Sequence, residues 1–322
     1  MMQTATLQAR QLTKHFAIGG VLSGGLRQVR AVEEVELSLH PGQTLGLVGE
    51  SGCGKSTVGR LLVRLLLPTS GAVYLHGEDI GLFRGDKLRQ LRRKLQIVFQ
   101  DPLSSLNPRH RVSRILGAPF RIHASCPSEQ IDGRVAELMQ AVGLDPGMRR
   151  KYPHEFSGGQ CQRIGIARAI ALEPEVIVCD EPVSALDVSV QAQIINLLRD
   201  LRRESKVALL FISHDLAVVE NLCHHVAVMY LGRIIELADR DSLFDKPHHP
   251  YTEALLASVP RLRAVGKGSR PPVLAGEIPS PVNPPSGCAF HPRCPLARDV
   301  CRRERPVLSA RADNHSVACH LR

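Results

Sequence analysis

The chain of 322 residues contains no tryptophan and few aromatic residues, and it also lacks long apolar runs. The best candidate, LLVRLLLP at residues 61–68, is short and carries Arg64, so we expect no membrane-spanning helix. The opening residues, MMQTATLQARQLTKHF, have no apolar stretch after their few charges, so a signal peptide is not expected. Together these absences indicate a cytosolic protein, in which reducing conditions disfavour disulfides among the nine cysteines.

Acidic residues are the scarcer charge: 41 Lys and Arg stand against 31 Asp and Glu, a formal net charge of +10. This balance favours anionic partners such as nucleotides, nucleic acid or an anionic membrane surface, although a generally basic surface would give the same count. The apolar content of 43% is ordinary for a globular protein. The length allows one large α/β domain with appendages, or two domains.

Apolar patterns predict alternating strands and helices. The stretch AVEEVELSLH, a turn at Pro41-Gly42 and the run Thr44 to Val48 predict a strand pair leading into a buried strand. A helix is expected from Ser56 to Leu67, ended by Pro68. Farther on, EVIVCDEP and KVALLFISHD read as buried strands on either side of the amphipathic stretch SVQAQIINLLRDLRRES. This alternation predicts a parallel sheet covered on both faces.

A phosphate-binding pattern spans Gly49 to Ser56, where GESGCGKS fits G-x-x-x-x-G-K-[ST] between an apolar strand and a helix. Glycines let successive backbone N–H groups curl around a phosphate, and the helix N-terminus adds partial positive charge. Lys55 would reach the β- and γ-phosphates, and the Ser56 hydroxyl would join the Mg²⁺ shell. The residues therefore predict a site for a nucleoside triphosphate.

The strand VIVCDEP supplies a complementary acidic pair. Asp180 at its end could hold Mg²⁺ directly or through water, and Glu181 follows in position to polarise a water for attack on the γ-phosphate. Taken alone, such a pair is more often a solvated strand end. Its occurrence together with the phosphate loop favours the catalytic interpretation.

Further motifs follow in a fixed order along the chain. After the phosphate loop come VFQDP with Gln100, FSGGQ with Ser157-Gly158-Gly159-Gln160, the Asp-Glu strand, SALD with Asp187 and ISHD with His214. In the order and residue identity of these motifs, the sequence resembles the ATP-binding subunits of ABC transporters over roughly residues 7–260. One departure is Phe156, where many relatives have Leu, and either residue can fill an apolar position.

The resemblance implies an α/β P-loop NTPase fold, the ABC nucleotide-binding domain with a RecA-like core, an antiparallel β subdomain and a helical subdomain. The ABC ATPase domain would span residues 1–260, with the helical subdomain at about 103–170. Residues 261–322 would form a Pro-rich linker and a Cys-rich C-terminal extension. The stretch at residues 17–30 is an insertion to which we assign no role.

The resemblance also assigns roles to residues. ATP would be held by Phe16, Gly49, Ser51, Gly52, Cys53, Gly54, Lys55, Ser56, Thr57 and Gln100. Phe16 would stack on adenine, unless it is simply a core residue near a strand end. Mg²⁺ would be held by Ser56, Gln100 and Asp180. Glu181 would be the general base, and His214 would contact the γ-phosphate.

Two further elements would act between subunits. Ser157 to Gln160 would complete the ATP site of the opposite subunit, and Asp187 would lie at the dimer seam. Closure on two ATP molecules and reopening after hydrolysis would then drive the membrane subunits. The alternative for Ser157 to Gln160 is a helix N-cap that serves this chain alone.

Four sequence segments resemble more specifically the F-type ATPase of bacterial dipeptide/oligopeptide importers: VFQDPLSSLNPR, MYLGRIIE, HHPYTEALLASVP and GEIPSPVNPPSGCAFHPRCP. The implied partners are a second, D-type ATPase subunit, two membrane permeases and a substrate-binding protein, at the cytoplasmic face of the bacterial inner membrane. Nickel complexes and glutathione are alternative solutes. A soluble ABC ATPase acting on the ribosome or nucleic acid, an exporter subunit and an ATP-sensing regulator are rival functions, and the first has no double ATPase domain or coiled-coil insertion here to support it.

Four cysteines close the chain, Cys288, Cys294, Cys301 and Cys319. Their spacing contains no C-x₂₋₄-C knuckle, which disfavours zinc, although nearby histidines leave a mixed zinc site open. Four thiolates are compatible with a [4Fe–4S] cluster. The importer resemblance favours that cluster, with a structural use, because a Pro-rich tail of low apolar content cannot bury a core.

Overall fold

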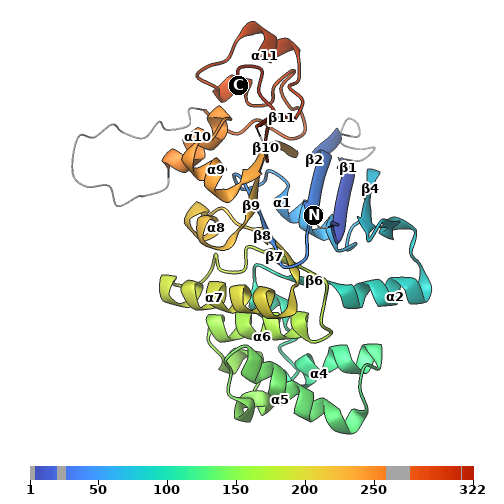
Figure 1. The fold of residues 1–322 in the computed structure, drawn as a ribbon. Helices are drawn as coiled ribbons and strands as arrows, with labels where there is room; N and C mark the ends of the chain where they lie inside the picture. Colours follow the sequence, from blue (N-terminus) through green and yellow to red (C-terminus); the bar gives the residue numbers. More distant parts are fainter. Residues whose placement is uncertain (1–3, 20–26, 259–275, 313) are drawn as a thin grey trace, which may run out of the picture.

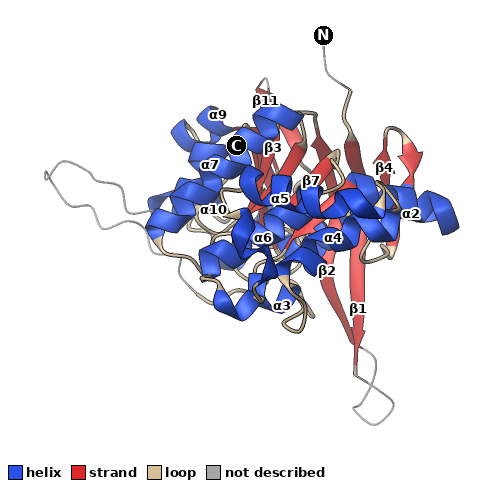
Figure 2. Cartoon of the chain, turned by 90° about the horizontal axis from the view of Figure 1, so that it is seen from below, coloured by secondary structure: helices blue, strands red, loops and turns tan. Residues whose placement is uncertain are grey.

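The computed structural model describes residues 4–19, 27–258, 276–312 and 314–322. The proposed boundary at residues 260/261, the first part of the predicted linker (261–275) and the centre of the 17–30 insertion lie outside the described residues. The described parts form two sheets with helices around them (Figures 1 and 2).

The larger sheet has eight strands in the order β11-β12-β10-β9-β3-β8-β7-β6. The strands from β9 to β6 run parallel, whereas β10, β12 and β11 add antiparallel partners at one edge. All five residues of β3, β7 and β8 are buried, as expected for parallel strands covered on both faces. The strands are β3 (Thr44–Val48), β6 (Leu95–Val98), β7 (Val176–Asp180), β8 (Ala208–Ile212), β9 (His225–Tyr230), β10 (Arg233–Asp239), β11 (Ser309–Ala312) and β12 (His315–Val317).

The smaller sheet is antiparallel, in the order β2-β1-β4-β5. Its first two strands are long and pair as far as Ile18 opposite Arg27, so they project beyond the other two (Figure 2). The expected pairing of the stretch before Pro41-Gly42 with Thr44–Val48 is wrong, because that stretch is β2, which pairs with β1 while β3 joins the larger sheet. The strands are β1 (Leu7–Ile18), β2 (Arg27–Leu39), β4 (Ser70–Leu75) and β5 (Glu78–Asp79).

Helices cover the larger sheet, and every regular element between residues 102 and 170 is helical. In Figure 1, α4 and α5 lie at the opposite end of the molecule from α11. The helices are α1 (Lys55–Leu62), α2 (Gly85–Lys94), α3 (Pro102–Ser105), α4 (Val112–His123), α5 (Ile131–Ala141), α6 (Gly158–Ile170), α7 (Val188–Ser205), α8 (Leu216–Leu222), α9 (Arg240–Asp245), α10 (Pro250–Ala257) and α11 (Asp299–Arg303). Short 3₁₀ turns are η1 (Ile80–Leu82), η2 (Ser128–Gln130), η3 (Pro146–Arg150), η4 (Pro153–Glu155) and η5 (His291–Arg293).

Helix α1 ends five residues before the expected end at Leu67. Arg64 adopts a left-handed conformation with φ of 55°, which stops the helix. Its guanidinium donates hydrogen bonds to the carbonyls of Gly81 (3.3 Å) and Phe83 (2.8 Å), on the segment after β5. A long-range contact therefore overrides the local helical pattern.

The larger sheet separates two apolar cores, because alternate side chains of each strand point to opposite faces. Ile177 and Cys179 of β7 belong to the core that includes the helices of residues 112–170. Val176 and Val178 face the core under the antiparallel sheet. Phe290, from the C-terminal region, is buried in the first of these cores, so the C-terminal region packs on the main body.

Candidate functional site

The loop between β3 and α1 takes a shape that only glycine allows at two positions. Gly49 and Gly54 have φ of 151° and 107°. A Cβ at Gly49 would lie 2.2 Å from the carbonyl oxygen of Met229, and one at Gly54 would lie 2.1 Å from that of Ala31. The backbone can therefore curl tightly in front of α1, where the first N–H groups of the helix are open to an anion.

Lys55, the first residue of α1, turns its side chain back into this loop. Its ammonium donates hydrogen bonds to the carbonyls of Gly49 (2.8 Å) and Glu50 (3.0 Å), and the residue is 5% exposed. Neutral carbonyls are weaker partners for a buried cation than a charged phosphate oxygen would be. The loop therefore holds a positive charge at its centre that suits a phosphate.

Ser56 and Asp180 meet at the end of β7. The Ser56 hydroxyl donates to Asp180 Oδ1 at 2.8 Å, and Asp180 is only 4% exposed. Burial raises the pKa of the Asp180 carboxyl above its usual range, against the hydrogen bond from Ser56, which lowers it. A buried carboxylate beside a hydroxyl is the oxygen donor set that Mg²⁺ prefers, so these residues fit that ion.

Glu181 has a left-handed backbone with φ of 47°, a conformation that costs a non-glycine residue roughly 1–3 kcal/mol. Its N–H is held by the carbonyl of Ile212 at 3.0 Å. One carboxylate oxygen accepts from Gln100 Nε2 (2.9 Å), and the other lies 3.3 Å from His214 Nδ1. The three side chains come from three different loops, and the strained backbone aims the carboxylate between its two neighbours.

These groups line one cavity of about 580 Å³, a size that suits a nucleotide. Nine residues predicted from the sequence line it: Ser51, Gly52, Gly54, Lys55, Ser56, Thr57, Gln100, Glu181 and His214. Three others were not predicted, Val29, Ala31 and Pro281. The first two belong to β2, whose proximity to the loop no local pattern reveals.

Three predicted ATP-site residues do not line this cavity. Gly49 and Cys53 shape the loop from behind, and Cys53 is buried. Phe16 lies on β1 opposite Val29, with its ring about one third exposed and the Lys14 ammonium 5.2 Å from its centroid. Phe16 therefore lies on β1, next to Val29 of β2, which lines the cavity.

Comparison with known proteins agrees with this geometry. The model of the ABC transporter family matches residues 32–184, and that of the oligopeptide/dipeptide transporter C-terminal region matches residues 235–301. The probable peptide ABC transporter ATP-binding protein y4tS of Sinorhizobium fredii is 55% identical, covering 100% of this chain and 91% of its own length. The oligopeptide transport ATP-binding protein AppF of Bacillus subtilis is 50% identical over 99% and 98%.

This chain belongs to the family of ABC transporter ATP-binding proteins. The family predicted from the sequence, and its α/β ATPase domain, are thereby confirmed. Among solved structures, the dimeric ATP-binding cassette MJ0796 bound to ADP and Pi aligns with a TM-score of 0.65. It is 26% identical and covers 73% of this chain and 98% of its own. CbiO1 of Clostridium perfringens aligns with a TM-score of 0.64 at 25% identity, over 76% and 92%.

The signature segment of this ABC ATPase lies at the start of α6. Ser157 caps the helix, with its hydroxyl accepting from Gln160 N–H at 3.3 Å and the Gln160 side chain accepting from Ser157 N–H at 3.0 Å. Ser157 and Gly158 are exposed, and no residue from 157 to 160 lines the cavity. The segment is therefore ordered and accessible but takes no part in this chain's own nucleotide cavity.

Asp187 is likewise exposed at the start of a helix, α7. Its carboxylate accepts from Val190 N–H (3.0 Å) and Ser189 Oγ (2.9 Å). The hydrogen bond from Val190, followed by the one from Ser189, lowers the pKa of Asp187. Val188 next to it is an exposed apolar side chain, so this corner of the molecule offers surface for a partner.

The four C-terminal cysteines come from separate turns of the tail. Cys288 N–H donates to Cys301 O at 2.8 Å, which ties the first and third together. Burial first, and then the nearby thiols of Cys301, Cys319 and Cys294, raise the pKa of Cys288 to about 11. Yet no group of three or more Cys, His, Asp or Glu side chains in the described residues is arranged to hold a metal ion. The donor set suits a cluster, whereas the placement of the side chains does not yet ligate one.

Within the described part of the chain, no helix is both long enough and apolar enough to span a membrane.

Proposed function

We propose that this protein is the ATP-hydrolysing subunit that energises import of di- or oligopeptides through a membrane ABC transporter. The names of its relatives support the peptide class, since they are described as peptide or oligopeptide transport ATP-binding proteins. The observation that carries the ATPase role is the convergence of Lys55, Ser56 and Glu181 on one cavity. Nickel complexes and glutathione are alternative solutes, because the solute itself does not touch this subunit.

In the proposed reaction, the loop N–H groups and Lys55 bind the phosphates of ATP. Ser56, Gln100 and Asp180 would hold Mg²⁺, which would neutralise charge on the β- and γ-phosphates. Glu181 accepts a proton from the attacking water, which forms a bond to the γ-phosphorus as the bond to the β-phosphate oxygen breaks. The contact between His214 and Glu181 keeps the carboxylate aimed at that water.

The exposed signature supports a site completed between two subunits. Ser157 to Gln160 would contact the nucleotide held by a second ATPase subunit, and Asp187 would lie at the seam between the two. We propose a heterodimer with a D-type subunit, two membrane permeases and a substrate-binding protein, on the cytoplasmic face of the bacterial inner membrane. No nucleic acid takes part. Residues 1–260 would be the ATPase domain, with 103–170 its helical part and 261–322 the linker and extension.

The substitution Glu181→Gln tests the catalytic assignment. It keeps the shape of the side chain but removes the base, so we expect hydrolysis to fall at least ~100-fold while ATP binding remains. Glu175→Gln, at the opposite end of β7 and paired with Lys94, is the matched control and should hydrolyse ATP at the normal rate. Hydrolysis by Glu181→Gln at the rate of the control would show that the base lies elsewhere.

Affinity purification from membranes tests the cellular role. Recovery of two multispanning permeases and a second ATPase supports the importer, and uptake assays with labelled peptides, nickel complexes and glutathione then separate the solutes. Recovery of ribosomes or nucleic acid instead would favour the rival soluble ATPase.

We further propose that Cys288, Cys294, Cys301 and Cys319 bind a [4Fe–4S] cluster with a structural role. The gathering of four thiols in one region supports this, although their side chains would have to turn to share one group. Anaerobic purification with iron, sulfide and zinc analysis is the test. Four irons and four sulfides per chain support the cluster, whereas zinc without iron supports the alternative.

A further inference from the structure

An ion pair that is buried on the arginine side joins the C-terminal region to the phosphate loop. Arg293, in the turn η5 between two of the tail cysteines, is 8% exposed. Its guanidinium makes two parallel hydrogen bonds to the Glu50 carboxylate, Nη1 to Oε2 at 2.7 Å and Nη2 to Oε1 at 2.9 Å. Glu50 is the second residue of the phosphate loop, so the two ends of this contact are 243 residues apart in sequence.

The backbone of Glu50 is held as well as its side chain. Its N–H donates to the hydroxyl of Tyr251 on α10 at 2.9 Å, and its carbonyl accepts from the Lys55 ammonium at 3.0 Å. Tyr251 packs edge-on against Tyr230 and Phe290, with ring centroids 4.8 and 5.4 Å away. Phe290 precedes Arg293 by three residues, so the aromatic cluster fixes the turn that presents the guanidinium.

Arg293 neutralises the negative charge that Glu50 brings to the phosphate loop. A carboxylate in a loop that binds phosphates repels its ligand unless a cation neutralises it. Lys55 is turned toward the loop carbonyls and is the cation expected to meet phosphate, so it is not available to offset Glu50. Arg293 approaches with a geometry that both neutralises the carboxylate and restrains it, because a two-pronged guanidinium pair fixes orientation as well as distance.

We propose that Arg293 is a positioning residue for nucleotide binding, which couples the folded C-terminal region to the shape and charge of the phosphate loop through Glu50. The inference rests on the ATP site proposed above. It makes ATP affinity depend on an arginine that does not line the cavity.

The proposal predicts that substituting Arg293 and substituting Glu50 have different effects on the Kd for Mg·ATP. Arg293→Gln leaves the Glu50 carboxylate in the phosphate loop without its guanidinium partner, so the Kd for Mg·ATP of the full-length protein should rise at least tenfold. Glu50→Gln breaks the same ion pair but leaves a positive charge, so its Kd should stay within threefold of the wild type. The double variant Glu50→Gln/Arg293→Gln should recover to within about threefold. Displacement of a fluorescent ATP analogue gives each Kd, with the melting temperature measured in parallel.

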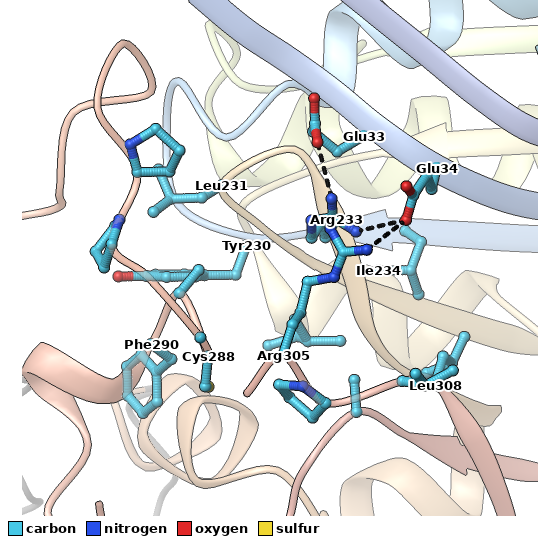
Figure 3. A pocket seen from close by; sticks show the side chains of 18 of the residues that line it. Glu33, Glu34, Tyr230, Leu231, Arg233, Ile234, Cys288, Phe290, Arg305 and Leu308 are labelled. Atoms are coloured by element: carbon cyan, nitrogen blue, oxygen red, sulfur yellow. Dashed lines mark hydrogen bonds and ion pairs between the residues drawn. The ribbon is translucent and has the colours of Figure 1, made fainter. Parts of the chain in front are cut away.

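A matched control uses another arginine of the tail. Arg305 joins the C-terminal region to Glu34 of β2 at 3.0 Å, beside a separate cavity of about 510 Å³ (Figure 3). Arg305→Gln should leave the Kd for Mg·ATP unchanged. If Arg293→Gln and Glu50→Gln weaken ATP binding equally, or if Arg293→Gln lowers only the melting temperature, the positioning role is wrong. If Arg293→Gln does not fold, the double variant still decides, because a tenfold weaker Kd there contradicts the charge argument. Absence of ATP binding by the wild type would instead overturn the proposed function.

Discussion

The phosphate loop and the signature segment are both helix N-termini, but the chain treats them differently. At α1 the N-cap is Gly54, which has no side chain to offer, and the open N–H groups face a cavity. At α6 the Ser157 hydroxyl accepts from Gln160 N–H and the Gln160 side chain accepts from Ser157 N–H, on an exposed surface. The loop therefore presents open N–H groups to a cavity, whereas the signature segment is held by a reciprocal cap and faces outward. This difference supports the proposal of a site divided between two subunits.

The largest expected effect separates the two regions directly. Lys55→Ala removes the buried ammonium from the loop, so ATP affinity and hydrolysis should both fall at least ~100-fold. Lys87→Ala, on the exposed face of α2, is the control and should change neither. Isothermal titration with ATP and a phosphate-release assay measure the two quantities. Normal binding by Lys55→Ala would mean that the loop is not the phosphate site.

A smaller effect is expected at the signature, where Ser157→Ala should affect hydrolysis but not binding. The isolated chain should bind ATP within twofold of the wild type, while hydrolysis in the assembled transporter falls about tenfold. Loss of the cap should also lower stability by about 1 kcal/mol. Asp79→Ala removes a comparable cap, on Gly81 N–H at 2.8 Å, far from either region, and should cost stability alone. If Ser157→Ala lost ATP binding as Lys55→Ala does, the proposed distinction between the signature segment and the phosphate loop would be wrong.

The smallest effect on this comparison concerns the stability in acid of helix α10, whose Tyr251 contacts the phosphate loop. His249 caps α10 by accepting from Tyr251 N–H at 3.0 Å, and burial lowers its pKa to about 3. In the unfolded chain His249 takes up a proton below its ordinary pKa near 6.5, whereas in the folded chain it stays neutral until about pH 3. The folded state therefore loses stability as pH drops from 6.5 toward 3. The slope should reach about 1.4 kcal/mol per pH unit. His249→Asn keeps a cap acceptor and should flatten the melting temperature between pH 6.5 and 5, whereas an unchanged slope would assign it to other groups.

The sequence predicted those parts of the molecule that depend on local pattern. The phosphate loop, the strand β7 and the helix α7 follow from glycine spacing and apolar periodicity, and each lies where expected. The roles of individual site residues and the iron–sulfur cluster stay predictions, since they concern ligands and partners outside this chain. The domain limits stay predictions because the boundary at 260/261 lies outside the described residues.

The parts that sequence reasoning missed depend on long-range contacts. Nothing local indicates that β2 pairs with β1 rather than with the next strand, or that Val29 and Ala31 line the cavity beside the phosphate loop. Arg293 appears in the sequence only as one basic residue between cysteines. Its partner Glu50 occupies a variable position of the phosphate pattern, and the charge there is the one sequence signal that points to a nearby cation.

The edge of the larger sheet has a consequence for aggregation of the protein. Strand β12 covers β10, and His315 on it contacts the fully buried Glu236 at 2.8 Å. Because β3 begins at Thr44 and β12 begins at His315, segments far apart in the sequence complete this sheet. Without β12, Glu236 would keep its hydrogen bonds from the N–H groups of His248 and His249, but the edge of β10 would be unpaired, which favours aggregation. The pairing of β12 with β10 therefore protects the protein against association through that strand edge.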